Sequence, residues 1–317
     1  YLNINEKLRY SPELNEVSEK ITDFGAYSQM NFVKYVDTGI RFLRNQDVGE
    51  VFINDSDPVF IPLETYNKLS LKLDRFDIIT PRVVTIGNAA IVLDSYLPAS
   101  ANQNLAQIKP NTGKINPFYL VIFLFSFYGR KQFERLATGN VQPWLNLFQI
   151  KTLKIFVPSD KKQEDIKKKV LEMSRELKNS QDFYSQAEKM LLEELGLMDF
   201  KIEDDLSFVV NFSDVKSSNR IDPDYFQQKY QKLISKLKNQ NSKLLTEVID
   251  NVAAKFSPLL TPGKIFRYVE LANINSSLGI IDGFSEVLGK EAPDRAKRVL
   301  KEGDIIVSSI GGSLNKI

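Results

Sequence analysis

Amide and basic side chains are concentrated in one stretch of this sequence, and together they could read a nucleic acid. Asn and Gln can form paired hydrogen bonds with an adenine edge, and Arg or Lys can do so with guanine. Residues 95–157 contain an amide-rich run at 102–107 and a loop, Thr-Gly-Asn-Val-Gln-Pro-Trp, at 138–144. Any one of these amides is better interpreted as a turn or capping residue, whereas the cluster favours DNA readout. Trp144 could stack on a base, but packing at a domain edge is the favoured interpretation.

The charge of the chain is distributed unevenly around this stretch. The net charge is only +2. Residues 95–157 nevertheless carry seven Lys or Arg against Glu134 alone, a net of +6, whereas residues 26–94 carry seven basic and nine acidic groups, a net of −2. Such a basic patch is typical of a polyanion site. The candidate DNA-binding residues are Arg44, Arg82, Asn88, Asn102, Gln103, Asn104, Lys109, Lys114, Arg130, Lys131, Asn140 and Gln142.

Few side chains remain for enzymatic chemistry. The 317-residue chain contains no Cys and no His, which excludes thiolate and imidazole catalysis and the metal sites built from these ligands. Asn116-Pro117-Phe118-Tyr119 is similar to an amino-methyltransferase motif but lacks one proline, and neither a glycine-rich cofactor loop nor a Gly-x-x-x-x-Gly-Lys phosphate loop occurs. We interpret the motif as a helix start and expect no catalytic residue, no metal and no cofactor bound by this chain.

Strands and helices are expected to alternate around these residues. A helix starts at Pro117 behind the N-cap Asn116, and we expect it to be buried because residues 118–127 are apolar on all sides. Strand-like runs lie at 51–53, 77–80, 83–86, 91–93 and 153–157.

A long coiled-coil helix is expected after this first domain. From Ile166, apolar or small residues recur at alternating spacings of four and three, which is the pattern of a coiled-coil seam. With an N-cap at 159 or 160 and a stop at Gly196, the helix would span residues 159–195 and measure about 55 Å. A single apolar stripe of this length predicts a partner helix. The seam residues are Ile166, Val170, Met173, Leu177, Tyr184, Ala187 and Leu191, with Ser180 in the same register.

A second, shorter amphipathic helix is expected from Asp222-Pro223 onward, after a strand-like stretch at 206–212. Its apolar residues repeat the spacing of the first seam. They are Phe226, Tyr230, Leu233 and Leu237.

Part of the sequence occurs twice. Residues 40–48 match residues 266–274, which lie 226 positions further on. Further matches join 77–79 to 304–306, at a separation of 227, and 86–87 to 310–311, at 224. Matches in the same order at nearly one separation predict a duplicated domain. We therefore expect a mixed α/β (α+β) chain with a first domain at 1–157, a long helix at 158–197 and the N-terminal part of a second copy at 198–317.

The two ends of the sequence lead to a related expectation. The second copy stops at Ile317, and the chain begins at Tyr1 without Met or an apolar leader, so we expect the interior of a longer sequence. The longest apolar run, 117–128, is shorter than the roughly 20 residues that a membrane span needs. We expect a cytoplasmic protein without a membrane partner.

Local strings then suggest a family. Residues 212–215, Phe-Ser-Asp-Val, with 219–226, Asn-Arg-Ile-Asp-Pro-Asp-Tyr-Phe, look like the entry into a second recognition domain. Residues 138–143 look like the turn before a closing strand, and Pro158 with Gln163 and Ile166 like the start of a connecting helix. With the duplication and the heptad helix, they resemble the DNA specificity subunit of type I restriction-modification systems, from about Phe24 to the end. The chain departs from that pattern by lacking the second half of domain two and a second long helix.

The resemblance implies a noncatalytic subunit with two target-recognition domains, each reading one half of a bipartite double-stranded DNA sequence. It also implies modification (methyltransferase) subunits as partners, two of them, and restriction subunits in the full complex. Those partners would bind S-adenosylmethionine, ATP and magnesium, methylate adenine and cleave DNA. The long helix could set the half-site spacing, because one turn of DNA measures about 34 to 36 Å.

Two other interpretations stay open. The chain could be the specificity region of a fused single-chain enzyme whose methyltransferase portion precedes Tyr1. It could instead be a coiled-coil scaffold that binds only protein. Salt dependence separates a scaffold from a DNA reader, because a protein that contacts phosphates loses affinity steeply as salt rises.

Overall fold

The computed structural model describes the chain as two compact units, residues 1–177 and 178–317, with their boundary inside one long helix. No helix in the residues it describes is long and apolar enough to cross a membrane. The described residues are 8–25, 27–55, 57–139, 142–200, 207–238, 242–251, 255–275 and 279–308.

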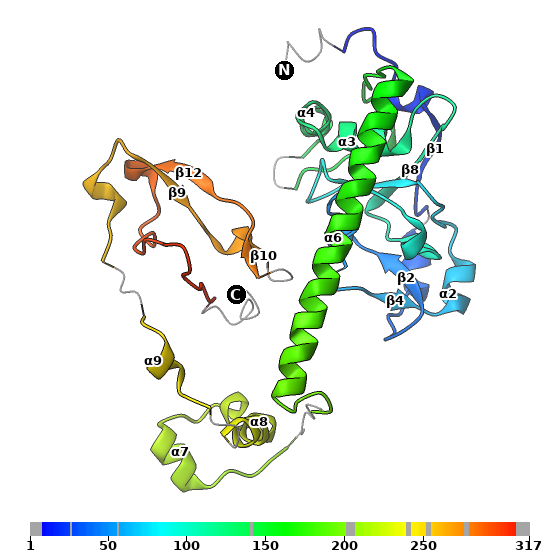
Figure 1. Ribbon diagram of the computed structural model, residues 1–317. Coiled ribbons are helices and arrows are strands. Elements are labelled where there is room, and N and C mark those ends of the chain that lie inside the picture. The colour runs from blue at the N-terminus through cyan, green and yellow to red at the C-terminus, as the bar shows by residue number, and fades with distance from the viewer. Residues whose placement is uncertain are drawn as a thin grey trace. The chain divides into compact units, whose positions relative to one another are not determined.

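The first unit is built on two sheets (Figure 1). The larger has the strand order β1-β8-β5-β6-β3, and its neighbours are antiparallel except for the parallel pair β3 and β6. Its strands are β1 (Ser18–Asp23), β3 (Glu50–Val51), β5 (Ile78–Pro81), β6 (Ala89–Ile91) and β8 (Leu105–Pro110). The smaller has the order β4-β2-β7, from β2 (Ile40–Leu43), β4 (Phe60–Ile61) and β7 (Ala99–Ala101).

Both faces of the larger sheet are buried, each in its own apolar core. Successive side chains of a strand point to opposite faces. Ile78 of β5 accordingly packs in the core that the helices cover, whereas Ile79 packs in the core shared with the smaller sheet. Ala89 and Ala90 of β6 divide in the same way. The hydrophobic effect therefore holds this sheet in place from both sides.

Helices cover the core that contains Ile78. In α3 (Pro117–Phe125), Asn116 Oδ1 accepts a hydrogen bond from Phe118 N at 2.9 Å, which confirms the predicted cap. Most of α3 is buried, as expected. The helix breaks at Ser126, which caps α4 (Phe127–Leu136). The shorter helices of this unit are α2 (Leu63–Lys68), α5 (Leu147–Lys151) and the 3₁₀ turns Leu14–Glu16 (η1), Tyr27–Phe32 (η2), Asn45–Asp47 (η3) and Asp94–Tyr96 (η4).

The long helix, α6 (Asp160–Glu194), is present as predicted. Its first turns pack on the first unit: Val170 is buried in the core, and Gln163 Oε1 accepts from Asn116 N at 2.8 Å. Ile166 packs against the same core. The other seam residues are exposed, and their pairing with a second helix stays a prediction. These are Met173, Leu177, Tyr184, Ala187 and Leu191.

The second unit combines short helices with small sheets. Strand β9 pairs with β12, and β10 with β11, both antiparallel. The expected amphipathic helix is present as a 3₁₀ turn, Pro223–Phe226 (η5), followed by α8. The remaining bounds are α7 (Phe212–Ser218), α8 (Gln228–Lys238), α9 (Leu245–Val248), η6 (Pro258–Leu260), β9 (Ile265–Tyr268), η7 (Leu271–Asn273), β10 (Ile274–Asn275), β11 (Ile280–Ile281), β12 (Ser285–Leu288) and η8 (Gly289–Glu291).

The repeat predicted from the sequence recurs in the backbone pairing. Arg41 faces Phe60 across β2 and β4, and Arg267 faces Glu286 across β9 and β12, so both partners are displaced by 226 residues. The 3₁₀ turns η3 and η7 follow their strands at that same displacement.

Two side-chain caps recur with the strands. Arg44 N donates to Asp47 Oδ2 at 2.8 Å, and in the second unit Glu270 N donates to Asn273 Oδ1 at 2.9 Å. Asp77 Oδ2 accepts from Asp74 N at 2.7 Å, as Asp304 Oδ2 does from Lys301 N at 2.8 Å. The local geometry is therefore duplicated, while several of the side chains that build it differ. The third sequence match, at 310–311, lies outside the described residues.

Three expected strands are wrong. At 83–86 only Val83 forms a β-bridge, because the chain turns at Val84, whose φ is +66°. At 153–157 a single bridge joins Lys154 to Glu13, since Pro12 has no N–H to extend a ladder and η1 begins directly afterwards. In the last expected strand, 206–212, Leu206 lies outside the described residues, and the residues after it form no strand before α7 begins at Phe212.

The break between α3 and α4 depends on a glycine. A Cβ placed on Gly129 would lie 2.1 Å from the carbonyl oxygen of Leu124, far inside van der Waals contact. We expect Gly129→Ala to lower the free energy of unfolding by about 3 kcal/mol, because the two helices must separate to admit the methyl group. Urea unfolding measures this. Gly113→Ala is the matched control, since its Cβ would meet only the Asn111 side chain, at 3.3 Å; equal losses would contradict the assignment.

Candidate nucleic-acid interface

The end of β5 and the start of β8 bring two candidate segments together. Pro81 of β5 pairs with Leu105 of β8, so the residues just beyond the strands, Arg82 and Asn104, are neighbours. Arg82 N donates to Asn104 O at 2.8 Å. The amide run at 102–104 and the loop at 82–88 therefore lie at one edge of the sheet.

Two more segments join this edge. Val83 forms a β-bridge with Trp144, and Leu145 N donates to Arg82 O at 2.8 Å, which brings in the 138–144 loop. Asn45 of η3 donates from Nδ2 to Val83 O at 3.0 Å. From α4, the side-chain stem of Arg130 lies against Gly87, where a Cβ would be 3.4 Å from Arg130 Cγ. Tertiary contacts thus assemble a loop cluster from residues 44–48, 82–88, 102–104, 130 and 142–145.

Arg44 is occupied within the protein. Its guanidinium donates to Asp47 from Nε at 3.2 Å and from Nη2 at 3.0 Å, and to Asp57 Oδ2 at 3.1 Å. It also donates to the Asp57 carbonyl oxygen. The hydrogen bond to Asp47 is the largest cause of a raised Arg44 pKa. Arg44 therefore anchors the loop before β4, and a contact between it and DNA stays a prediction.

Arg82 and Asn88 hold the two ends of the 82–88 loop. Arg82 donates from Nε to Leu145 O at 3.0 Å and forms an ion pair with Asp23, Nη1 to Oδ2, at 2.5 Å. Asn88 donates from Nδ2 to Val48 O at 3.1 Å. Both side chains hold backbone atoms in position and so fix the shape of this loop. A contact between either of them and DNA stays a prediction.

The amides at 102–104 form a turn. Asn102 Oδ1 accepts from Asn104 N at 3.1 Å, which is an Asx-turn and matches the capping interpretation. Gln103 lies between them with a buried Oε1 that has no hydrogen-bond partner among the described residues. All three amides are only partly exposed.

The exposed part of the loop cluster consists of other residues. Arg130 and Gln142 are exposed, and no carboxylate of the described chain lies within ion-pair distance of Arg130, whose guanidinium sits 5.1 Å from the Phe125 ring centre. Lys131 is paired with Glu134 at 2.6 Å. Trp144 is 46% exposed, which is more than we expected for a residue that packs at a domain edge. Asn140 lies outside the described residues.

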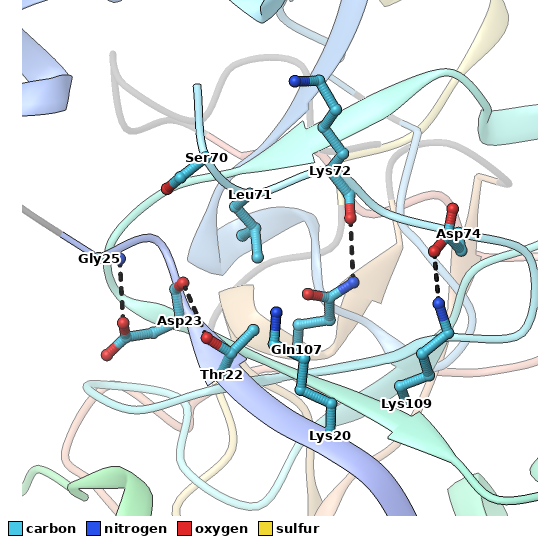
Figure 2. Close-up of a pocket in the computed structure, with 10 residues that line it drawn as sticks. All are labelled: Lys20, Thr22, Asp23, Gly25, Ser70, Leu71, Lys72, Asp74, Gln107 and Lys109. Atoms are coloured by element: carbon cyan, nitrogen blue, oxygen red, sulfur yellow. Dashed lines mark hydrogen bonds and ion pairs between the residues drawn. The ribbon is translucent and has the colours of Figure 1, made fainter. Parts of the chain in front are cut away.

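Lys109 and Lys114 lie toward the other end of β8. Lys109 lines a pocket of about 270 Å³ and pairs with Asp74, Nζ to Oδ2, at 2.6 Å (Figure 2). That hydrogen bond is the largest cause of a raised Lys109 pKa. Lys114 is exposed and donates to Glu16 O at 2.8 Å. Lys20 and Lys72 also line the pocket.

One residue links the pocket to the loop cluster. Asp23, at the end of β1, lines the pocket and is the ion-pair partner of Arg82. The candidate residues therefore divide between two connected places on the first unit: the loop cluster, and the lysine-lined pocket beside β1 and β8.

The sequence interpretation missed Val84. It lies at the tip of the 82–88 loop, 69% exposed and with a positive φ. The β-branched run Val-Val-Thr-Ile suggested a strand, and the Gly87-Asn88 pair after it was the available sign of a turn.

Comparison with known proteins finds similarity in structure alone. No protein-family model matches the sequence, and no curated protein matches it. The crystal structure of the type I restriction-modification system S subunit from M. genitalium has a TM-score of 0.44 at 10% identity, over 59% of this chain and 44% of that one. The HsdS subunit from Thermoanaerobacter tengcongensis has a TM-score of 0.38 at 15% identity, over 63% and 50%.

A third structure comes from work on complex assembly and conformational transition of the type I R-M system. Its TM-score is 0.38 at 16% identity, and the match covers 62% of this chain and 50% of that one. This chain thus spans about half the length of the solved structures that it matches. The first two of these structural neighbours are S (HsdS) subunits of type I restriction-modification systems.

Asp77 is a buried carboxyl that bonds to two residues of the pocket lining, Asp74 and Gln107. Besides Asp74 N, its Oδ2 accepts from Gln107 Nε2, whereas its buried Oδ1 has no partner in the described residues. Burial is the largest cause of a raised Asp77 pKa. The folded state therefore holds this proton more tightly than the unfolded chain does, and stability decreases as pH rises through the raised pKa.

We expect the free energy of unfolding of the wild type to increase, relative to Asp77→Asn, as pH falls from neutral through the raised Asp77 pKa. The reason is that Asn does not titrate, so the difference between the two proteins isolates this carboxyl. Urea unfolding at a series of pH values measures it. Parallel pH profiles for the two proteins would contradict the assignment.

Proposed function

We propose that this chain is a sequence-specific DNA-binding subunit that reads a bipartite target for a type I restriction-modification system. The observation that carries the proposal is the duplication. A strand, a capped 3₁₀ turn and an antiparallel partner strand recur 226 residues apart, once on each side of α6. Two similar units with different side chains suit two different half-sites.

The loop cluster of the first unit is the proposed DNA-contacting surface. It presents Arg130, which has no ion-pair partner among the described residues, together with a half-exposed indole, Trp144, and the exposed amide of Gln142. Cations bind phosphate or guanine, amides bind adenine, and indoles stack or pack on apolar base atoms. The lysine-lined pocket adds Lys20 and Lys72 nearby, which suits contact with the DNA backbone.

The catalytic steps would belong to partner chains. In this proposal the subunit is noncatalytic and holds methyltransferase subunits, two of them, while restriction subunits join the full complex. S-adenosylmethionine, ATP and magnesium would bind to those partners. The exposed seam on α6 supports a binding surface for other helices, because an apolar stripe in water is unfavourable unless it is covered.

That same seam favours a second candidate, a scaffold that binds only protein. A scaffold has no need of phosphate contacts, and its affinity for DNA would be weak at every salt concentration. A DNA reader releases counterions when it binds, so its affinity falls steeply with salt. Titration with DNA therefore decides between the two candidates.

We expect the chain to bind duplex DNA with an affinity that falls linearly on a log–log plot against salt. Arg130→Gln should reduce the slope by about 0.9, the contribution of one phosphate contact. Fluorescence of Trp144, the one tryptophan, reports binding because the indole lies in the loop cluster. Arg75→Gln is the matched control: Arg75 is exposed but paired with Asp94 at 3.0 Å. DNA affinity independent of salt would contradict the proposal.

The length of α6 supplies a second test. If the helix sets the distance between the two readers, then inserting four residues between Lys178 and Ser180 adds about 6 Å and lengthens the spacer of the target by about two base pairs. Methylome sequencing of a host that carries the altered gene measures this. Lys178→Ala changes the same place without changing length and should keep the spacer. An unchanged spacer after the insertion would refute the role of the helix.

A further inference from the structure

The tip of the 82–88 loop holds an unusual backbone conformation. Val84 has a φ of +66°, and Thr85 N donates to Val83 O at 2.9 Å across it, which together describe a γ-turn of the strained, positive-φ type. A β-branched residue in this region is an outlier, because its branched Cβ crowds the backbone. This conformation costs free energy, and such strain persists where the surrounding structure enforces it.

Four hydrogen bonds hold the 82–88 loop in this conformation. Arg82 N is bonded to Asn104 O, and Arg82 O accepts from Leu145 N, both at 2.8 Å. Asn45 Nδ2 donates to Val83 O at 3.0 Å. At the other end, Asn88 O accepts from Thr80 Oγ1 at 2.8 Å. Three candidate DNA-binding residues, Arg82, Asn88 and Asn104, thus help to hold the loop in a shape that it would not adopt alone.

The result is an exposed isopropyl group in the 82–88 loop of the proposed DNA surface. Val84 is 69% exposed although it is apolar. Its neighbour Val83 pairs with Trp144, and Gly87 of the same loop supports the stem of Arg130. An apolar side chain held in this exposed conformation, in a loop that contacts both Trp144 and Arg130, adds little to the core.

We propose that Val84 is a specificity-determining residue, which contacts the 5-methyl group of a thymine in the major groove. This inference rests on the proposed function. An isopropyl group has no donor or acceptor, so it cannot read the hydrogen-bonding edge of a base. The thymine methyl is the apolar group that distinguishes one base in the major groove, and apolar side chains are its partners. Arg130 and Gln142, from the same loop cluster, then supply polar contacts.

The test removes the apolar group from each partner of the contact in turn: the 5-methyl group from thymine and the isopropyl group from Val84. The target is first selected from a pool of random duplexes with the full chain, and each thymine of the selected half-site is then replaced by deoxyuridine. At one thymine, we expect deoxyuridine to weaken binding by about three- to fourfold, the effect of one buried methyl group. In Val84→Gly the same replacement should change affinity less than 1.5-fold, roughly within error.

Val84→Gly is suited to this test because it should fold. Glycine adopts positive φ without strain, so the midpoint of thermal unfolding should stay unchanged or rise. The matched control is Leu63→Ala, which shortens an exposed apolar side chain on α2 in the same unit. Leu63→Ala should keep the full effect of deoxyuridine.

The outcomes separate this inference from the function beneath it. If the wild type selects a sequence but no thymine methyl matters, or if Val84→Gly keeps the same discrimination, then the role of Val84 is refuted and the DNA-reading function stands. If the wild type selects no sequence and binds duplex without salt dependence, the proposed function itself fails. Loss of discrimination in Val84→Gly alone supports the contact.

Discussion

The antiparallel pairing of β5 with β8 is the interaction on which the first unit depends. Both strands lie inside the sheet with a core on each face, so their register is strongly specified: a slip by one residue would move Ile78 and Ile79 into each other's core. That register also decides the positions of the polar groups. At one end it joins Arg82 to Asn104 and begins the loop cluster, and toward the other it sets Lys109 beside the turn that Asp77 caps.

The side chains of the loop cluster fall into two groups, one bonded within the protein and one exposed to solvent. Arg44, Arg82 and Asn88 are partly buried and bonded to the protein's own carboxylates and carbonyls, so they are architectural in the free chain. Buried polar groups are expected to find such partners, because leaving them unpaired is costly. What they support is exposed: the Val84 tip, the Trp144 indole and the Arg130 guanidinium. The residues of the loop cluster therefore form two groups: some are exposed to solvent, and others hold the 82–88 loop in its conformation.

The duplication shows which parts of this design are constant. The register of the strand pair and the caps of the following turns recur, yet Arg44 is replaced by Glu270 and Asp47 by Asn273. Both Asp and Asn can accept the backbone hydrogen bond, so the turn survives the change while the ion pair with Arg44 does not. The hairpins after the turns differ as well: Val48 pairs with Ile53, whereas Ile274 pairs with Ile281. A constant frame with variable loops suits the proposed reading of two different half-sites.

Local signals in the sequence were enough to predict the start of α3, the long helix α6 and the repeat. Asn116 and Pro117 specify a helix start by their own chemistry, heptad spacing specifies α6, and the repeat is visible as a nearly constant separation. The site was predictable only as a set of residue types. Which of them face solvent depended on hydrogen bonds between distant segments, such as Asn45 to Val83, 38 residues apart, and Arg82 to Leu145, 63 residues apart. The positive φ of Val84 could not be predicted in this way, because the residues around it have the composition of a strand. Contacts with distant segments hold Val84 in that conformation. Only the tertiary structure decided that an apolar residue, rather than one of the amides, forms the tip of the loop.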